Sequence, residues 1–156
     1  MPRDPGEVVL EVKNLRTPTH PQHTLNFEVH AGEIVGVAGL VGAGRTELFE
    51  TLFGATPAVG GEIRVENQKV NPCSPREAIQ NGLALAPEDR KRTGLILEFD
   101  IGQNISLASL RNHSSRFAII NRSSEREEAE RQVNALKIKT PSTSTLVMNL
   151  SGGNQQ

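Results

Sequence analysis

A glycine-rich run that ends in a cation and a hydroxyl is the part of this chain best suited to chemistry. It consists of Gly39, Leu40, Val41, Gly42, Ala43, Gly44, Arg45 and Thr46. Every position fits the phosphate-binding pattern G-x-x-x-x-G-K-[ST] except the lysine, which is arginine here. Glycines let backbone N–H groups surround an anion, and the Thr46 hydroxyl can reach a magnesium ion at the start of a helix. The run therefore predicts a loop that holds nucleotide phosphates.

Arginine in place of lysine changes the shape of the cation in this loop. A lysine ammonium is a compact point charge on a slim stem, whereas a guanidinium is a planar fork. We expect the width of this fork to fit poorly where the β- and γ-phosphates must both be held. We therefore expect Arg45 to support nucleotide binding without efficient hydrolysis.

The segments on either side of the loop supply the order strand, loop, helix. Residues 33–38 are short, apolar and β-branched, which favours a buried parallel strand. Residues 46–53 place leucines and phenylalanines at helical spacing, and Gly54 follows as a stop signal. The flanks therefore agree with a phosphate-binding loop.

Two other interpretations of the glycine run remain open at this point. One is a glycine-rich turn without a ligand. The other is a dinucleotide-binding loop, for which Glu62 or Glu66 could serve as the acid that binds ribose. A strict G-x-G-x-x-G does not occur, because Glu47 stands three positions after Gly44.

Composition excludes several classes of function. The net charge is −1, from 17 basic and 18 acidic residues, and the only aromatic residues are five phenylalanines. Neither a basic surface nor a set of stacking aromatics is predicted, so we expect no nucleic-acid partner. No stretch of about 18 apolar residues and no hydrophobic signal core occurs, so we expect a cytoplasmic chain. The lone Cys73 and the scattered histidines lack metal-ligand spacing.

The rest of the chain is predicted to be antiparallel strands first and helices later. A Ser-Pro-x-Glu run at residue 74 and an Asp-x-x-Gln run at residue 100 have the form of helix caps. A third cap is predicted at Ser124, for a helix whose charged residues face water. Strands are expected over 8–12, 25–29, 62–66 and 83–86, and helices over 74–82, 100–110 and 124–136. No internal repeat or second domain is visible.

A second group of residues, at the end of the printed chain, has small and hydroxyl side chains suited to a phosphate. It reads Leu150, Ser151, Gly152, Gly153, Asn154, Gln155 and Gln156. Together with the loop at 39–46, it resembles the ATP-binding-cassette family, whose signature is of the Leu-Ser-Gly-Gly-Gln type. With residues 39–47 and 87–91 included, the chain looks like the second cassette of monosaccharide importers, such as those for ribose, galactose and xylose.

The resemblance implies an α/β fold with a P-loop NTPase core, an antiparallel N-terminal part and a helical subdomain. It divides the chain into a nucleotide-binding part, about 1–98, and a helical part with the signature, about 99–156. It implies that ATP and Mg²⁺ bind at residues 39–47, including Glu47, with Thr46 as the metal ligand. Ser151, Gly152 and Gly153 would instead touch a nucleotide held by a companion cassette. Other implied partners are a membrane permease, at whose inner face the chain would sit, and indirectly a sugar-binding protein.

Several departures from the family pattern shape what we expect. The aromatic residue that usually stacks on adenine is absent from 17–24, where only prolines and histidines are candidates, so adenine affinity should be weaker. Glu88 stands nearest the place of a glutamine that reaches towards magnesium and the permease. The chain as printed stops at the signature, so we identify no catalytic residue and expect no ATP turnover by it alone.

The same stopping point leads to two structural expectations. The strand at 33–38 should have exposed edges, and the signature should be too short to form a helix. Our leading interpretation is part of an importer's ATP-binding subunit, with a weak or non-hydrolytic site at 39–46. The alternatives are a regulatory or structural nucleotide-binding module without turnover and a nicotinamide-dependent oxidoreductase.

Overall fold

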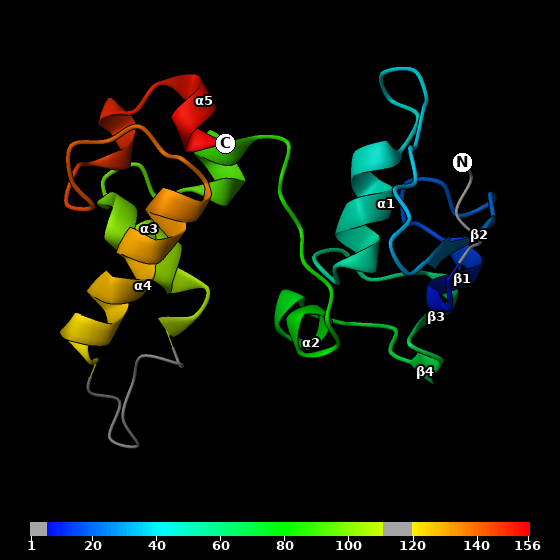
Figure 1. The fold of residues 1–156 in the computed structure, drawn as a ribbon. Coiled ribbons are helices and arrows are strands. Elements are labelled where there is room, and N and C mark those ends of the chain that lie inside the picture. Colours follow the sequence, from blue (N-terminus) through cyan, green and yellow to red (C-terminus); the bar gives the residue numbers. More distant parts are fainter. Residues whose placement is uncertain (1–5, 111–119) are drawn as a thin grey trace, which may run out of the picture. The chain divides into compact units, whose positions relative to one another are not determined.

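A four-stranded antiparallel sheet forms the base of the N-terminal part of the protein. The computed structural model describes residues 6–110 and 120–156, which separate into two compact units with the boundary between residues 85 and 86. In the first unit, β1 (Val8–Arg16) lies between β2 (Leu25–His30) and β3 (Gly60–Val65), and β4 (Gln68–Lys69) follows β3 at the edge (Figure 1). This sheet confirms the strands predicted at 8–12, 25–29 and 62–66, and β3 and β4 form an antiparallel hairpin.

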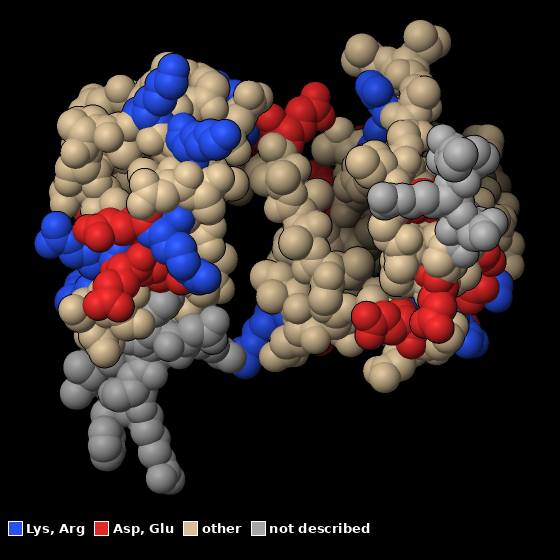
Figure 2. Space-filling view, in the orientation of Figure 1, with Lys and Arg blue, Asp and Glu red and all other residues tan. Residues whose placement is uncertain are grey.

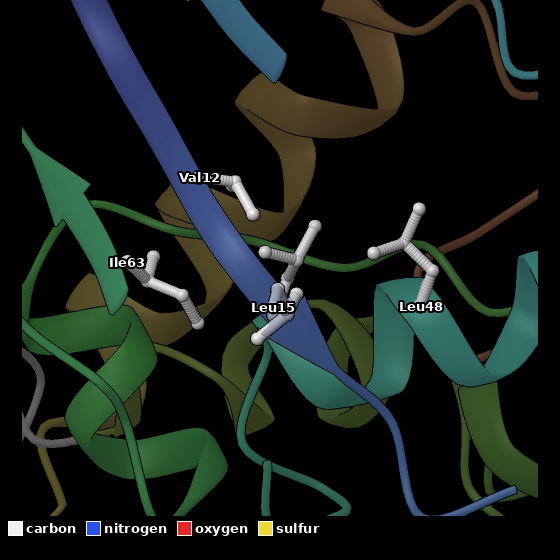
Figure 3. Close-up of a cluster of buried hydrophobic side chains, with 5 residues drawn as sticks. Val12, Leu15, Leu48 and Ile63 are labelled. Atoms are coloured by element: carbon white, nitrogen blue, oxygen red, sulfur yellow. The ribbon is translucent and has the colours of Figure 1, made fainter. Parts of the chain in front are cut away.

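Helix α1 (Arg45–Leu52) packs on this sheet through a small hydrophobic core. Val12 lies opposite Phe27 on β2 and Ile63 on β3, so the central strand contributes to both pairings. Figure 3 shows the side chains from β1, β3 and α1 gathered together. Each fully buried aliphatic side chain of this kind stabilises the fold by about 1.5–3 kcal/mol. The core residues are Val12, Leu15, Leu48, Leu52 and Ile63.

A polar side chain is buried beside this core. Thr51, on α1, is 1% exposed, and its hydroxyl has no hydrogen-bond partner among the described residues. A buried hydroxyl without a partner reduces stability, because it has lost its bonds to water.

The predicted strands at 33–38 and 83–86 are not formed, so both predictions are wrong. Neither segment belongs to the sheet, and Ile34 is 96% exposed. A parallel strand is held by hydrogen bonds to neighbours on each side. No segment of the described residues pairs with either stretch, so their apolar composition alone does not make them strands.

The cap predicted for α2 (Pro75–Gln80) is confirmed. The Ser74 side chain accepts a hydrogen bond from the Glu77 N–H at 3.3 Å, and Pro75 occupies the first turn. Gly82 follows the helix with φ of +82°, a backbone conformation that glycine adopts without strain.

The second unit is built from short helices. Helix α3 (Ile101–Leu107) begins with the predicted capping box, in which Asp100 and Gln103 each accept from the other's backbone N–H. It packs against α4 (Arg122–Ala135), and both Ile101 on α3 and Ala129 on α4 are buried. A π-helical turn at Arg90–Gly94, a 3₁₀ turn at Val147–Asn149 and α5 (Gly152–Gln155) complete the unit.

Two details of α4 differ from prediction. The helix begins at Arg122, and Asn121 caps it by accepting from the N–H groups of Ser123 and Ser124. The predicted Ser124 cap is therefore wrong, because an asparagine three positions earlier already supplies the side-chain oxygen. Glu125 is only 8% exposed, whereas we expected all the charged residues of this helix to face water.

Two further ion pairs lie on the surface of α4. Arg126 bonds Glu130 at 3.0 Å, and Arg131 bonds Glu128. Figure 2 shows basic and acidic side chains interleaved over this helix. Within the described ranges, no helix has the length and apolar character needed to cross a membrane.

Candidate functional site

The glycine run at 39–46 forms a tight turn that leads directly into α1. Gly42 and Gly44 have φ of +84° and +81°, so both positions use the conformational freedom of glycine. The Ala43 N–H donates to the Leu40 carbonyl at 3.1 Å, and α1 begins at Arg45 with no side chain capping it. The N–H groups of an uncapped first turn are the groups that an anion binds. The local geometry therefore suits a phosphate.

The Arg45 side chain folds back along the loop. A Cβ atom placed on Gly39 would lie 3.7 Å from Arg45 Cδ and 3.0 Å from Ala43 Cβ. Arg45 itself is exposed, and its side chain has no hydrogen bond or ion pair among the described residues. The cation thus remains available to an anion, while its stem covers the first glycine of the loop.

Thr46 and Glu47 lie in the first turn of α1, at the positions predicted for them. Glu47 is the acidic residue of this turn, where the helix dipole favours a negative charge. The magnesium expectation depends on the Thr46 hydroxyl together with nucleotide phosphates. No cluster of histidine, cysteine or acidic side chains able to hold a metal ion exists within the described ranges.

A histidine lies beside the loop, in the segment 17–24 where the resemblance led us to look for an aromatic residue. A Cβ atom on Gly44 would lie 3.1 Å from Nδ1 of His20, so this imidazole packs on the last glycine. The ring of His23 is 6.2 Å away, centroid to centroid. Sequence reasoning named both residues as candidates for adenine stacking but gave no reason to place His20 at Gly44. Two turns, closed by the His20 N–H to the Thr17 carbonyl and by the His23 N–H to the His20 carbonyl, place the two imidazoles near each other.

Glu88 precedes an ordered turn in the second unit. The Asp89 side chain accepts from the N–H groups of Lys91 and Arg92 at 3.1 and 3.2 Å, and its carbonyl accepts from the Thr93 hydroxyl at 2.8 Å. Glu88 is exposed at the start of this turn. The charged run at 88–92 is therefore held in one conformation by its own side chains.

The signature forms a single helical turn, contrary to the expectation that it was too short to do so. Ser151 precedes α5, and its hydroxyl accepts from the Asn154 side chain at 3.0 Å. The Gln155 amide donates to the Val147 carbonyl at 3.0 Å, and the Asn154 side chain accepts from the Lys139 N–H at the same distance. These hydrogen bonds to residues outside α5 stabilise the single turn, although the segment is short.

The predicted site residues fall into two groups. Residues 39–47 belong to the first unit, whereas Glu88 and the signature belong to the second. Gly152 and Gly153 are exposed on α5, and Ser151 is exposed before it. The structure thus builds each predicted group locally, the first as a turn at a helix start and the second as a short anchored helix.

Comparison with known proteins gives the same picture. A profile of the ABC transporter family matches residues 22–156. The chain is 45% identical to the ribose import ATP-binding protein RbsA of Clostridium tetani, over 97% of this chain and 30% of that protein. It is also 45% identical to the xylose import ATP-binding protein XylG of Moorella thermoacetica, over 97% and 31%. For the galactose/methyl galactoside import protein MglA of Yersinia pestis the identity is 41%, over 97% and 30%. The chain spans about 30% of the length of these curated relatives.

Two solved structures share the fold. One is a dimeric post-hydrolysis state of the ATP-binding cassette MJ0796 bound to ADP and phosphate, with TM-score 0.69, 18% identity and coverage of 94% of this chain and 65% of that one. The other is a bacterial Atm1-family ABC exporter with ATP bound, with TM-score 0.61, 23% identity and coverage of 99% and 28%. The predicted α/β fold with a P-loop NTPase core is confirmed, and the chain belongs to the ABC transporter family.

Proposed function

We propose that this chain is part of the ATP-binding subunit of an importer for simple sugars, where it helps to couple ATP binding and hydrolysis to carbohydrate uptake. The observation that carries the proposal is the turn at 39–46, with left-handed Gly42 and Gly44 leading into the uncapped start of α1. The names of the relatives, which are ATP-binding proteins for ribose, xylose and galactose import, support the substrate class.

In this proposal the phosphate loop binds nucleotide but is poorly suited to hydrolysing it. Backbone N–H groups at the start of α1 bind the phosphates, and the exposed Arg45 guanidinium adds a positive charge. The Thr46 hydroxyl would take part in holding Mg²⁺, whose chemistry is to neutralise charge on the phosphates. His20 in place of a larger aromatic ring gives adenine a smaller surface.

The signature acts on a second nucleotide. Ser151, Gly152 and Gly153 present a hydroxyl and backbone amides to ATP held by a companion cassette, which carries out the hydrolysis. The complex would include a membrane permease, which places the chain at the inner face of the membrane, and a sugar-binding protein that contacts the permease. Glu88, at the start of the ordered turn, is the residue proposed to face magnesium and the permease.

The test uses the full-length protein with its companion cassette and compares the wild type with Arg45→Lys. Calorimetric titration with Mg-ATP should show weak binding at the wild-type site. The affinity of the variant should be about tenfold higher, because the lysine makes one better charge-assisted bond to the phosphates. The control is Arg92→Lys, the same chemical change at an exposed arginine of the second unit. A folded sample in which ATP does not bind at residues 39–46 would refute this half of the proposal.

A regulatory or structural module without turnover is the second candidate. The packing of the Arg45 stem on Gly39 favours it, because this packing reduces the space at the start of the loop. If Arg45→Lys raises transport-coupled hydrolysis in the intact pair, a merely structural role is wrong. Family membership does not favour the nicotinamide-dependent alternative. Fluorescence titration with NADH tests this alternative directly, since our proposal predicts that NADH does not bind tightly.

A further inference from the structure

One arginine of the second unit joins two segments that are far apart in the sequence. Arg90 Nε donates to the Gln155 side-chain oxygen at 3.2 Å, across a separation of 65 residues. The other end of the guanidinium lies against the signature, because a Cβ atom on Gly152 would be 3.0 Å from Arg90 Nη2. The same side chain therefore contacts α5 at its first and last residues.

Both partners of this contact are anchored independently. On one side, Asp89 caps the turn that contains Arg90, and the Leu95 N–H donates to the Arg90 carbonyl at 2.8 Å. On the other side, the Gln155 amide accepts from Arg90 and donates to the Val147 carbonyl at 3.0 Å. The guanidinium thus connects two ordered segments, and neither segment needs it in order to form its own turn.

The geometry requires the shape of arginine as well as its charge. The planar fork places Nε on Gln155 and Nη2 against Gly152 at the same time, whereas a lysine ammonium provides one point of contact. A Cβ atom at position 152 would lie 3.0 Å from Nη2, so the guanidinium would have to shift by a few tenths of an ångström to admit a side chain there. The arginine and the signature glycine therefore fit each other.

We propose that Arg90 is a positioning residue that links the signature to the turn at 87–94, so that the placement of Ser151–Gly153 follows the conformation of the turn that begins beside Glu88. This proposal rests on the proposed function, in which the signature acts on nucleotide in a companion cassette. It adds a route by which a change at Glu88 reaches the signature within the second unit. A rigid turn and a short anchored helix joined by one planar group move together.

The first test measures amide hydrogen exchange at 152–155 in the full-length protein and does not depend on activity. Arg90→Ala should raise exchange there about fivefold, the effect of losing one hydrogen bond. Arg90→Lys should raise it almost as much, because charge alone does not restore both contacts. Arg92→Ala is the control, as this exposed arginine lies in the same turn, and it should leave exchange unchanged. Equal exchange in Arg90→Ala and Arg92→Ala would overturn the proposal.

The second test measures ATP hydrolysis by the assembled pair of cassettes. Arg90→Ala should lower kcat about fivefold with KM for ATP unchanged, because Arg90 orients the signature and does not bind substrate. A changed KM with kcat intact would contradict a positioning role. In a double-mutant cycle, Arg90→Ala combined with Gln155→Ala should be no worse than Gln155→Ala alone, which also loses the bond to the Val147 carbonyl. Fully additive losses would refute the link.

The two proposals fail in different ways. A wild-type pair that hydrolyses no ATP counts against the proposed function, and the exchange experiment then still decides the role of Arg90. If Arg90→Ala does not fold, Gln155→Glu provides the second variant, because it keeps an acceptor for Arg90 and loses the donor to Val147. The link predicts that exchange at 90–94 stays at the wild-type level in Gln155→Glu and rises in Gln155→Ala. Equal exchange in these two variants would refute it.

Discussion

The buried carboxylate on α4 gives the sharpest prediction for the stability of the second unit. Glu125 is 8% exposed and accepts from the Ser106 hydroxyl at 2.7 Å and from Arg122 Nη1 at 2.9 Å. Ser106 lies on α3 and is 1% exposed, so its bond to Glu125 joins α3 to α4 away from water. The Arg122 side chain is 72% exposed, so the bond that it donates is screened by solvent.

The magnitude follows from the difference between these two bonds. Ser106→Ala removes the buried hydroxyl donor on α3, so the carboxylate loses the bond that joins the two helices. Loss of a hydrogen bond to a buried charged group costs about 2 kcal/mol, which lowers the melting temperature of a chain of this size by about 4–8 °C. Glu125→Gln keeps an acceptor for Ser106 and loses the exposed ion pair, so its cost should be about 1 kcal/mol or less.

The assay is equilibrium unfolding in urea, followed by circular dichroism, for these two variants and a matched control. Glu127→Gln is the control, because Glu127 is exposed on the same helix two positions away, and it should change stability by less than about 0.5 kcal/mol. Ser106→Ala must be clearly less stable than this control. Equal stability of the two would mean that the carboxylate is solvated, and the reasoning from burial would be wrong.

Two further predictions concern the first unit. The pKa of Glu62 is lowered by hydrogen bonds from Arg64 and then Lys69, so its contribution to stability is present above the ordinary value of 4.5 and lost as pH falls through the lower folded pKa. Unfolding curves of wild type and Glu62→Gln should therefore converge in acid, and a difference that persists there would argue against this pairing. Gly61→Ala should prevent folding or cost several kcal/mol, because its Cβ would lie 2.5 Å from the β1 backbone. Gly82 also has a positive φ, but no atom lies within 4 Å of the position of its Cβ, so Gly82→Ala should cost only about 1 kcal/mol in thermal melts. If the two substitutions cost the same, the close approach of Gly61 to β1 does not matter.

Local signals in the sequence were sufficient for the features that depend on neighbouring residues. The caps at Ser74 and Asp100 were predicted because each side chain bonds an N–H only three positions away. The turn at 39–46 and the start of α1 follow for a similar reason, since Gly42 and Gly44 supply the conformations that the turn needs. Hydrophobic alternation likewise located β1 and β2.

Features that depend on distant partners were not predicted. Residues 33–38 have the composition of a buried strand, but composition does not provide the neighbours that hold a strand in a sheet. Glu125 looks like the other acids of α4, and only the position of Ser106 on another helix makes it a buried group. The contact of Arg90 with Gly152 and Gln155 spans more than 60 residues, so no local pattern reports it.

The unpartnered hydroxyl of Thr51 leaves the first unit open to improvement. Valine has the same branched outline as threonine, with a methyl group in place of the hydroxyl. Replacing a buried hydroxyl that has no partner should raise the free energy of unfolding by about 1 kcal/mol. Thr51→Val should therefore stabilise the first unit, and position 51 is not among the proposed nucleotide contacts.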